Sequence, residues 1–296
     1  MSISIQQISY IHPDKEVLFS DLNFAISKGQ KLGLVGNNGC GKSTLLQIIA
    51  GQLSPSSGVI VRPDDLYYIP QHFGQYDSLT IAQALRIERK QQALHAILSG
   101  DASNENFVIL NDDWNIEERS IAALDLWGLG QFTLSYPMNL LSGGEKTRVF
   151  LAGMDIHHPS VVLMDEPTNG LDIPGKSQFR KFIASGMTDD KTIIISTHQV
   201  RDIDKILDHV LIMDNSRVLL DESTANICEK LLFLESDNRE LAEMALFASP
   251  SIQGNVMILP NTEGEESDIN LELLFNATLS VPQEIAKLFH TKTNEL

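Results

Sequence analysis

The spacing of apolar residues divides the chain into stretches with strand patterns and stretches with helix patterns. Residues 1–31 alternate apolar and polar positions, with turn residues at 12–14 and 27–29. Alternation with a period of two is typical of strands that bury one face. The first 31 residues therefore predict a short antiparallel sheet.

Three apolar runs farther along the chain predict strands, and the second and third of these are predicted to be buried. They cover residues 32–35, 161–164 and 193–195. Short continuous apolar runs are typical of parallel sheets that helices cover on both sides. Residues 210–213 and 218–220 predict a hairpin that closes this core. The predicted fold class is therefore α/β.

A strand pair is predicted at residues 59–61 and 66–69, and the chain after it has a helical pattern. Apolar residues between 78 and 98 recur at near-helical spacing, and residues 115–127 resume the pattern. We predict a helical subdomain, about residues 72–150, inserted into the α/β core.

The composition changes at residue 221. From there to residue 296 the chain carries fourteen Asp and Glu against four Lys and Arg, with a predicted strand at 256–259 between helices. We predict a main domain over residues 1–220 and an acidic accessory region over 221–296, which forms a small α+β C-terminal extension.

Composition and charge narrow the possible functions. The 296 residues carry a net charge of −17, which argues against a broad nucleic-acid surface because clustered Lys and Arg hold phosphate backbones. No apolar run approaches the roughly 18 residues that cross a bilayer, and no signal-peptide pattern is visible. The two cysteines, Cys40 and Cys228, indicate no disulfide framework. We expect a cytoplasmic protein that needs another chain to reach a membrane.

The candidate chemistry begins where the first of the three apolar runs ends. Residues 36–43 fit G-x-x-x-x-G-K-[ST], the phosphate loop of nucleoside triphosphatases. The glycines let backbone N–H groups turn inward as an anion nest, Lys42 adds a charge for phosphate, and Ser43 is placed to ligate Mg²⁺. A glycine-rich turn that binds nothing is the alternative, which the flanking strand and helix disfavour. The predicted nucleotide contacts in the loop are Gly36, Asn37, Asn38, Gly39, Cys40, Gly41, Lys42, Ser43 and Thr44.

A second helix N-terminus is predicted at residues 142–145, which read Ser-Gly-Gly-Glu. Ser142 and Glu145 have the spacing of a capping box ahead of an apolar run. Gly143 and Gly144 let a ligand approach the backbone N–H groups closely. The segment predicts a second phosphate-binding helix end, and an ordinary helix start is the alternative.

Ionisable side chains follow two buried runs at the sheet edge where open α/β folds bind ligands. Asp165 is predicted to hold Mg²⁺, directly or through water, and Glu166 to orient and deprotonate the attacking water. His198 is predicted to donate a hydrogen bond to a γ-phosphate, although an isolated histidine is more often structural. Tyr10 and His12 are candidates to stack on adenine, with a plain surface role as the alternative for both.

Taken together and in order, these motifs resemble the ATP-binding-cassette (ABC) ATPases over residues 1 to about 220. The residues that carry the resemblance are the phosphate loop, Gln71, residues 141–145, Asp165, Glu166, the turn 169–172 and His198. The resemblance implies ATP and Mg²⁺ as cofactors and a P-loop NTPase core with an antiparallel β subdomain. It implies that Gln71 senses the metal and the lytic water, that Glu166 is the general base, and that His198 stabilises the transition state.

The site of this family joins the phosphate loop of one protomer to the signature helix of the other. The resemblance therefore implies a homodimer on ATP binding, in which Ser142, Gly143 and Gly144 meet the nucleotide held by the second copy. The family usually has an aromatic residue where His12 stands, which leaves the adenine contact open between His12 and Tyr10.

Two branches of the family compete for this chain. Residues 110–119 and 144–148 look like the ABC-F proteins that act on ribosomes. From Met164 on, including residues 196–204, the chain looks like the ATP-binding subunit of a bacterial exporter. We therefore raise the hypothesis of a hybrid joined near residues 160–170.

We predict an exporter-type ATPase subunit at the inner face of the cell membrane. ATP binding closes a homodimer, hydrolysis assisted by Glu166 opens it, and the motion drives a separate permease subunit. The alternative is an ABC-F-type, ribosome-associated ATPase, which the missing second cassette and basic linker weaken. A nucleotide-gated binding module with little turnover is the third class, which an intact Glu166 and His198 disfavour.

Overall fold

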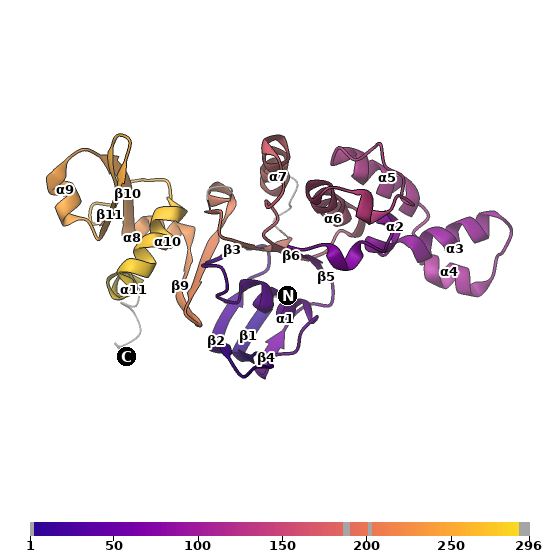
Figure 1. Cartoon of the computed structure of the whole chain (residues 1–296), viewed down its shortest axis with the longest axis horizontal. Coiled ribbons are helices and arrows are strands. Elements are labelled where there is room, and N and C mark those ends of the chain that lie inside the picture. Colours follow the sequence, from indigo (N-terminus) through magenta and orange to yellow (C-terminus); the bar gives the residue numbers. More distant parts are fainter. Residues whose placement is uncertain (1–2, 186–189, 201–202, 290–296) are drawn as a thin grey trace.

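The computed structural model describes residues 3–185, 190–200 and 203–289, and this part of the chain contains three β-sheets (Figure 1). Two are small antiparallel sheets, and the third is a central six-stranded sheet. The strand order of the central sheet is β5 (Leu66–Ile69), β6 (Val161–Asp165), β7 (Thr192–Thr197), β3 (Lys31–Gly36), β8 (His209–Asp214) and β9 (Arg217–Ser223). The α/β fold class predicted from the sequence is confirmed.

The central sheet is parallel except at β9, which pairs antiparallel with β8 as the predicted hairpin. All residues of β6 and β7 are buried, because both faces of the sheet are covered. One face, with Leu163 and Ile194, packs against α1 (Lys42–Ala50). The other face, with Val162 and Ile195, packs in one core with apolar residues of α6 (Gly143–His157) and α7 (Ile173–Ser185).

The N-terminal residues form the predicted antiparallel sheet, in which β1 (Ile3–Ile11) lies between β2 (Val17–Ile26) and β4 (Ser57–Val61). The predicted pairing of residues 59–61 with 66–69 is wrong, since β4 pairs with β1 and β5 pairs with β6. Pro63 in the connection has no N–H group to continue a ladder. The Asp65 carboxylate also accepts a hydrogen bond from the Ser160 backbone N–H at 2.8 Å, which holds the start of β5 beside β6.

Helices fill the segment between β5 and β6. They are α2 (Ile81–Ala84), α3 (Glu88–Leu98), α4 (Asn104–Leu110), α5 (Ile116–Leu126) and α6. The helical pattern over residues 78–98 is broken at Arg86, whose φ is 59°. A straight helix would point Leu85 and Ile87 to different faces, and the kink allows both to be fully buried.

The C-terminal residues form a small α+β unit at the opposite end of the central sheet from the helical region (Figure 1). Its elements are α8 (Thr224–Lys230), β10 (Leu231–Ser236), α9 (Arg239–Met244), β11 (Phe247–Ser251), β12 (Gly254–Pro260), α10 (Leu271–Ser280) and α11 (Pro282–Phe289). The strand predicted at 256–259 lies in β12, between α9 and α10. Our proposed domain boundary at residue 221 falls within β9. None of the helices in the described ranges has both the length and the apolar character of a membrane span.

Candidate nucleotide-binding site

A pocket of about 350 Å³ opens where β3, β6 and β7 reach their carboxyl ends. Open α/β sheets bind their ligands at this edge. The sequence predicted every residue of the wall except Leu18, which β2 contributes beside the phosphate loop. The wall is formed by His12, Leu18, Asn38, Gly39, Gly41, Lys42, Ser43, Thr44, Gln71, Glu166 and His198.

The phosphate loop connects β3 directly to α1. No side chain caps α1, and its N-cap residue Gly41 has a φ of 100°, which favours glycine. A Cβ atom on Gly36 would lie 2.4 Å from the Met213 carbonyl oxygen, so a larger residue would displace the loop. The first N–H groups of α1 therefore remain available to an anion that enters the pocket.

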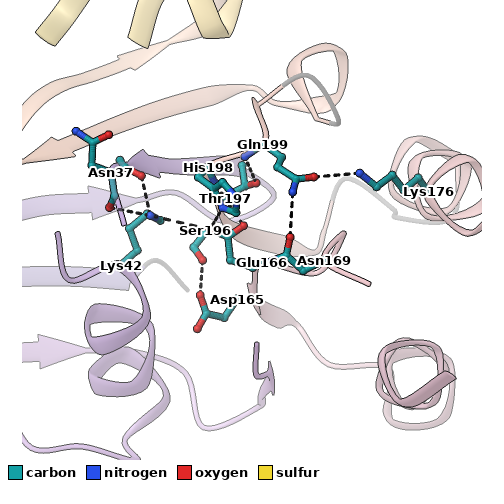
Figure 2. A network of polar contacts seen from close by, with 11 residues as sticks. Asn37, Lys42, Asp165, Glu166, Asn169, Lys176, Ser196, Thr197, His198 and Gln199 are labelled. Carbon is teal, nitrogen blue, oxygen red and sulfur yellow. Dashed lines mark hydrogen bonds and ion pairs between the residues drawn. The ribbon is translucent and has the colours of Figure 1, made fainter. Parts of the chain in front are cut away.

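The ammonium group of Lys42 lies over the loop (Figure 2). Its Nζ donates hydrogen bonds to the carbonyl oxygens of Gly36 at 2.7 Å and Asn37 at 3.2 Å. The Lys42 side chain is 6% exposed, and its Nζ is 4.0 Å from Oε1 of Glu166. Because a buried charge needs polar partners, these contacts hold the ammonium at the pocket wall.

Glu166 and His198 form the second ionisable pair of the pocket (Figure 2). The Glu166 side chain is 4% exposed, and its Oε1 is 2.9 Å from Nδ1 of His198. Glu166 has a φ of 51°, a backbone strain that occurs most often at functional sites. With Nδ1 turned to Glu166, the second ring nitrogen of His198 is left for a ligand. The pair can hold a water molecule and a phosphate at neighbouring positions.

The three predicted metal ligands have different places. Ser43 and Gln71 line the pocket, whereas Asp165 is not part of its wall. Asp165 is 2% exposed, and its Oδ1 accepts a hydrogen bond from the Ser196 hydroxyl at 2.5 Å. Burial raises the pKa of the nearby Tyr68 phenol, and the Asp165 charge adds to the effect. A hydroxyl, an amide and a carboxylate supply the oxygen ligands that Mg²⁺ prefers, so the donor types fit the metal.

Three other predicted loop residues are not part of the pocket wall. Gly36 and Asn37 hold Lys42 through their carbonyl oxygens. The Asn37 side chain donates a hydrogen bond to Asp214 at 3.0 Å. Burial raises the pKa of the Cys40 thiol, which packs against Gly36. These residues therefore stabilise the conformation of the phosphate loop without lining the pocket.

The structure separates the two candidates for the adenine contact. His12 lines the pocket. Tyr10 is not part of the wall, and its ring packs edge-on against His12 and lies 6.2 Å from the ring of Phe19. A nucleotide in this pocket would meet the imidazole first.

The predicted capping box at the start of α6 is confirmed. The Ser142 hydroxyl accepts from the Glu145 backbone N–H at 3.3 Å, and the Glu145 carboxylate accepts from the Ser142 backbone N–H at 2.7 Å. The second bond lowers the pKa of Glu145. Ser142, Gly143 and Gly144 do not line the pocket. Within the part of the chain that the structure describes, they are not brought to the phosphate loop.

Comparisons with known proteins identify the family of this chain. A family model described as ABC transporter matches residues 19–169, about half of the chain. The chain belongs to the ABC transporter family. The match includes the phosphate loop, Gln71, the start of α6 and Glu166, and the chain is an ABC-type ATPase.

Relatives in the ABC transporter family match most of the chain. The energy-coupling factor transporter ATP-binding protein EcfA2 of Methanospirillum hungatei is 31% identical over 73% of this chain and 54% of its own length. The Nod factor export ATP-binding protein I of Neorhizobium galegae is 25% identical over 97% of this chain and 78% of its own. Among solved structures, cbiO1 of Clostridium perfringens, part of the ABC transporter complex cbiONQ, has a TM-score of 0.54 and 27% identity, covering 75% of this chain and 88% of that chain.

The chain thus spans about half the length of the first of these relatives and more of the other two proteins. The match to the Nod factor export protein covers both sides of residues 160–170, where we placed a junction between two branches. The hybrid hypothesis stays a prediction.

Proposed function

We propose that the chain is the ATP-binding subunit of an exporter-type ABC transporter, and that two copies bind ATP between them. One observation carries the proposal. A complete phosphate pocket with a carboxylate and an imidazole lies at the sheet edge, while the glycine-rich start of α6 is not part of that pocket.

The start of α6 supports the dimer for two reasons. It is a glycine-rich helix N-terminus, which suits an anion, and it does not line the pocket that would hold the nucleotide of its own chain. A Cβ atom added to Gly143 would meet no atom within 4 Å. Open space at the N-terminus of a long helix is suited to a phosphate that arrives from outside the chain. In the proposed dimer this phosphate is the γ-phosphate held by the phosphate loop of the second copy.

In this proposal, each pocket residue has a separate role in ATP binding or hydrolysis. Lys42 and the first N–H groups of α1 bind the β- and γ-phosphates, and His12 contacts the base. Glu166 orients the attacking water and accepts its proton, while His198 holds Glu166 through Nδ1 and the phosphate through its other ring nitrogen. Ser43 and Gln71, with Asp165 next to them, would hold Mg²⁺, which would supply positive charge to neutralise the phosphates.

A membrane permease is the proposed partner, with this subunit bound at the cytoplasmic face. The name of the Nod factor export relative, whose match covers 97% of this chain, favours export. The name of the energy-coupling factor relative does not mention export, and its match covers 73% of this chain, less than that of the Nod factor export relative. The net charge of −17 disfavours a ribosomal role, since ribosomal RNA attracts basic surfaces.

Size-exclusion chromatography with Mg·ATP tests the core of the proposal. We expect Glu166→Gln to bind ATP without turnover and to elute as a dimer, while the unaltered chain hydrolyses ATP. A monomer that retains no nucleotide would contradict the proposal. Affinity capture from lysate then tests the partner: a permease supports the transporter role, and ribosomal particles contradict it.

A further inference from the structure

Gln199 follows His198 directly, at the end of β7, and both ends of its side-chain amide are hydrogen-bonded (Figure 2). Lys176 of α7 donates to Oε1 of Gln199 at 3.0 Å. Nε2 of Gln199 donates to Oδ1 of Asn169 at 3.2 Å. An ammonium can only donate, so Lys176 keeps Oε1 on its side and leaves Nε2 for Asn169.

Backbone hydrogen bonds also link Gln199 and Asn169 to the segments that carry His198 and Glu166. The Gln199 N–H donates to the Thr197 hydroxyl at 2.9 Å, and the adjacent His198 contacts Glu166. The Asn169 N–H donates to the Glu166 carbonyl oxygen at 3.0 Å. The amide therefore bridges the two short segments that carry His198 and Glu166.

The bridged turn also touches the start of α6. A Cβ atom on Gly144 would lie 2.6 Å from the carbonyl oxygen of Gly170, which follows Asn169. Such a close approach of two backbones leaves little room for one to move without the other. A shift of Asn169 is therefore passed both to Glu166 and to the N-terminus of α6.

We infer that Gln199 is a positioning residue for ATP hydrolysis, whose amide fixes the turn 169–170 between the Glu166–His198 pair and the start of α6. The inference rests on the proposed function, because α6 matters to catalysis only where it meets the nucleotide of a second copy. Gln199 does not line the pocket, so it acts through the residues that it holds.

A double-mutant cycle between Gln199 and Asn169 tests the inference. We expect Gln199→Ala to lower kcat about tenfold, because small displacements of reacting groups are costly, and to leave the KM for ATP within about twofold. We expect Asn169→Ala to act similarly, and the double variant to be no slower than the slower single variant. Asn169→Asp keeps an acceptor for Nε2, so it should stay within about threefold of the unaltered kcat.

Gln91→Ala is the matched control, because Gln91 donates an amide hydrogen bond to Glu117 at 2.9 Å in the helical region, away from the pocket. It should retain the unaltered kcat. An unchanged kcat in Gln199→Ala would overturn the inference, as would losses that multiply in the double variant or an Asn169→Asp variant as slow as Asn169→Ala. These outcomes would overturn the inference and leave the proposed function standing. The proposed function fails if the unaltered chain hydrolyses no ATP.

Discussion

The N-termini of α1 and α6 are both rich in glycine, and their surroundings differ. The start of α1 has no side-chain cap and lies in a pocket with Lys42, Glu166 and His198. The start of α6 is capped by its own Ser142 and Glu145 and lies outside that pocket.

A capped helix end is stable without a ligand, whereas an uncapped one leaves N–H groups that need a partner. In the proposed dimer, α1 binds the phosphates of the nucleotide held by its own chain. The start of α6 stays exposed to water until the second copy brings its nucleotide. Breaking each end separately should therefore produce different defects.

The largest effect is expected at the carboxylate beside α1. Glu166→Gln keeps the size of the side chain and removes the base, so kcat should fall about a thousandfold. Steady-state ATPase assays measure this loss, and equilibrium binding of ATP should be retained. A variant with more than about a tenth of the unaltered kcat would exclude Glu166 as the base.

Removal of the charge at α1 is expected to act on binding. Lys42→Ala deletes an ammonium that is buried in the loop, and ATP affinity should fall at least about 100-fold, or ~2.7 kcal/mol. Isothermal titration calorimetry with Mg·ATP measures the change. Lys28→Ala, which alters an exposed lysine paired with Asp190, is the control and should bind normally.

The smallest effect is expected at the cap of α6. Glu145→Gln should cost about 0.5 kcal/mol of folding stability at neutral pH. Because the folded-state pKa of Glu145 lies below its unfolded value, the carboxylate contributes this stability above about pH 4.5 and loses it as the pH falls through the folded-state pKa. Urea unfolding at several pH values should show the two proteins converging in acid. A constant difference would contradict the assigned bond.

Local motifs made much of this arrangement predictable. The phosphate loop is contiguous, and the edge positions of Glu166 and His198 follow from strands that end there. The Gln199–Asn169 contact was not predicted, because it joins side chains 30 residues apart whose meeting depends on how β6 and β7 pair. The hydrogen bond from the Ser196 hydroxyl to Asp165 was also not predicted, because it depends on how β6 and β7 pair.

A mixing experiment in the Glu166→Gln background tests most directly whether one ATP site is shared by two chains. One chain carries Lys42→Ala, and the other carries Ser142→Asp, which keeps a good N-cap but places a carboxylate against phosphate. Neither chain alone should retain Mg·ATP in a dimer through gel filtration, although the Ser142→Asp chain can still bind ATP at its own α1. Mixed dimers contain one intact site, so an equal mixture should retain at least about a quarter of the ATP held by Glu166→Gln. A mixture that retains no more than the separate chains would contradict a shared site.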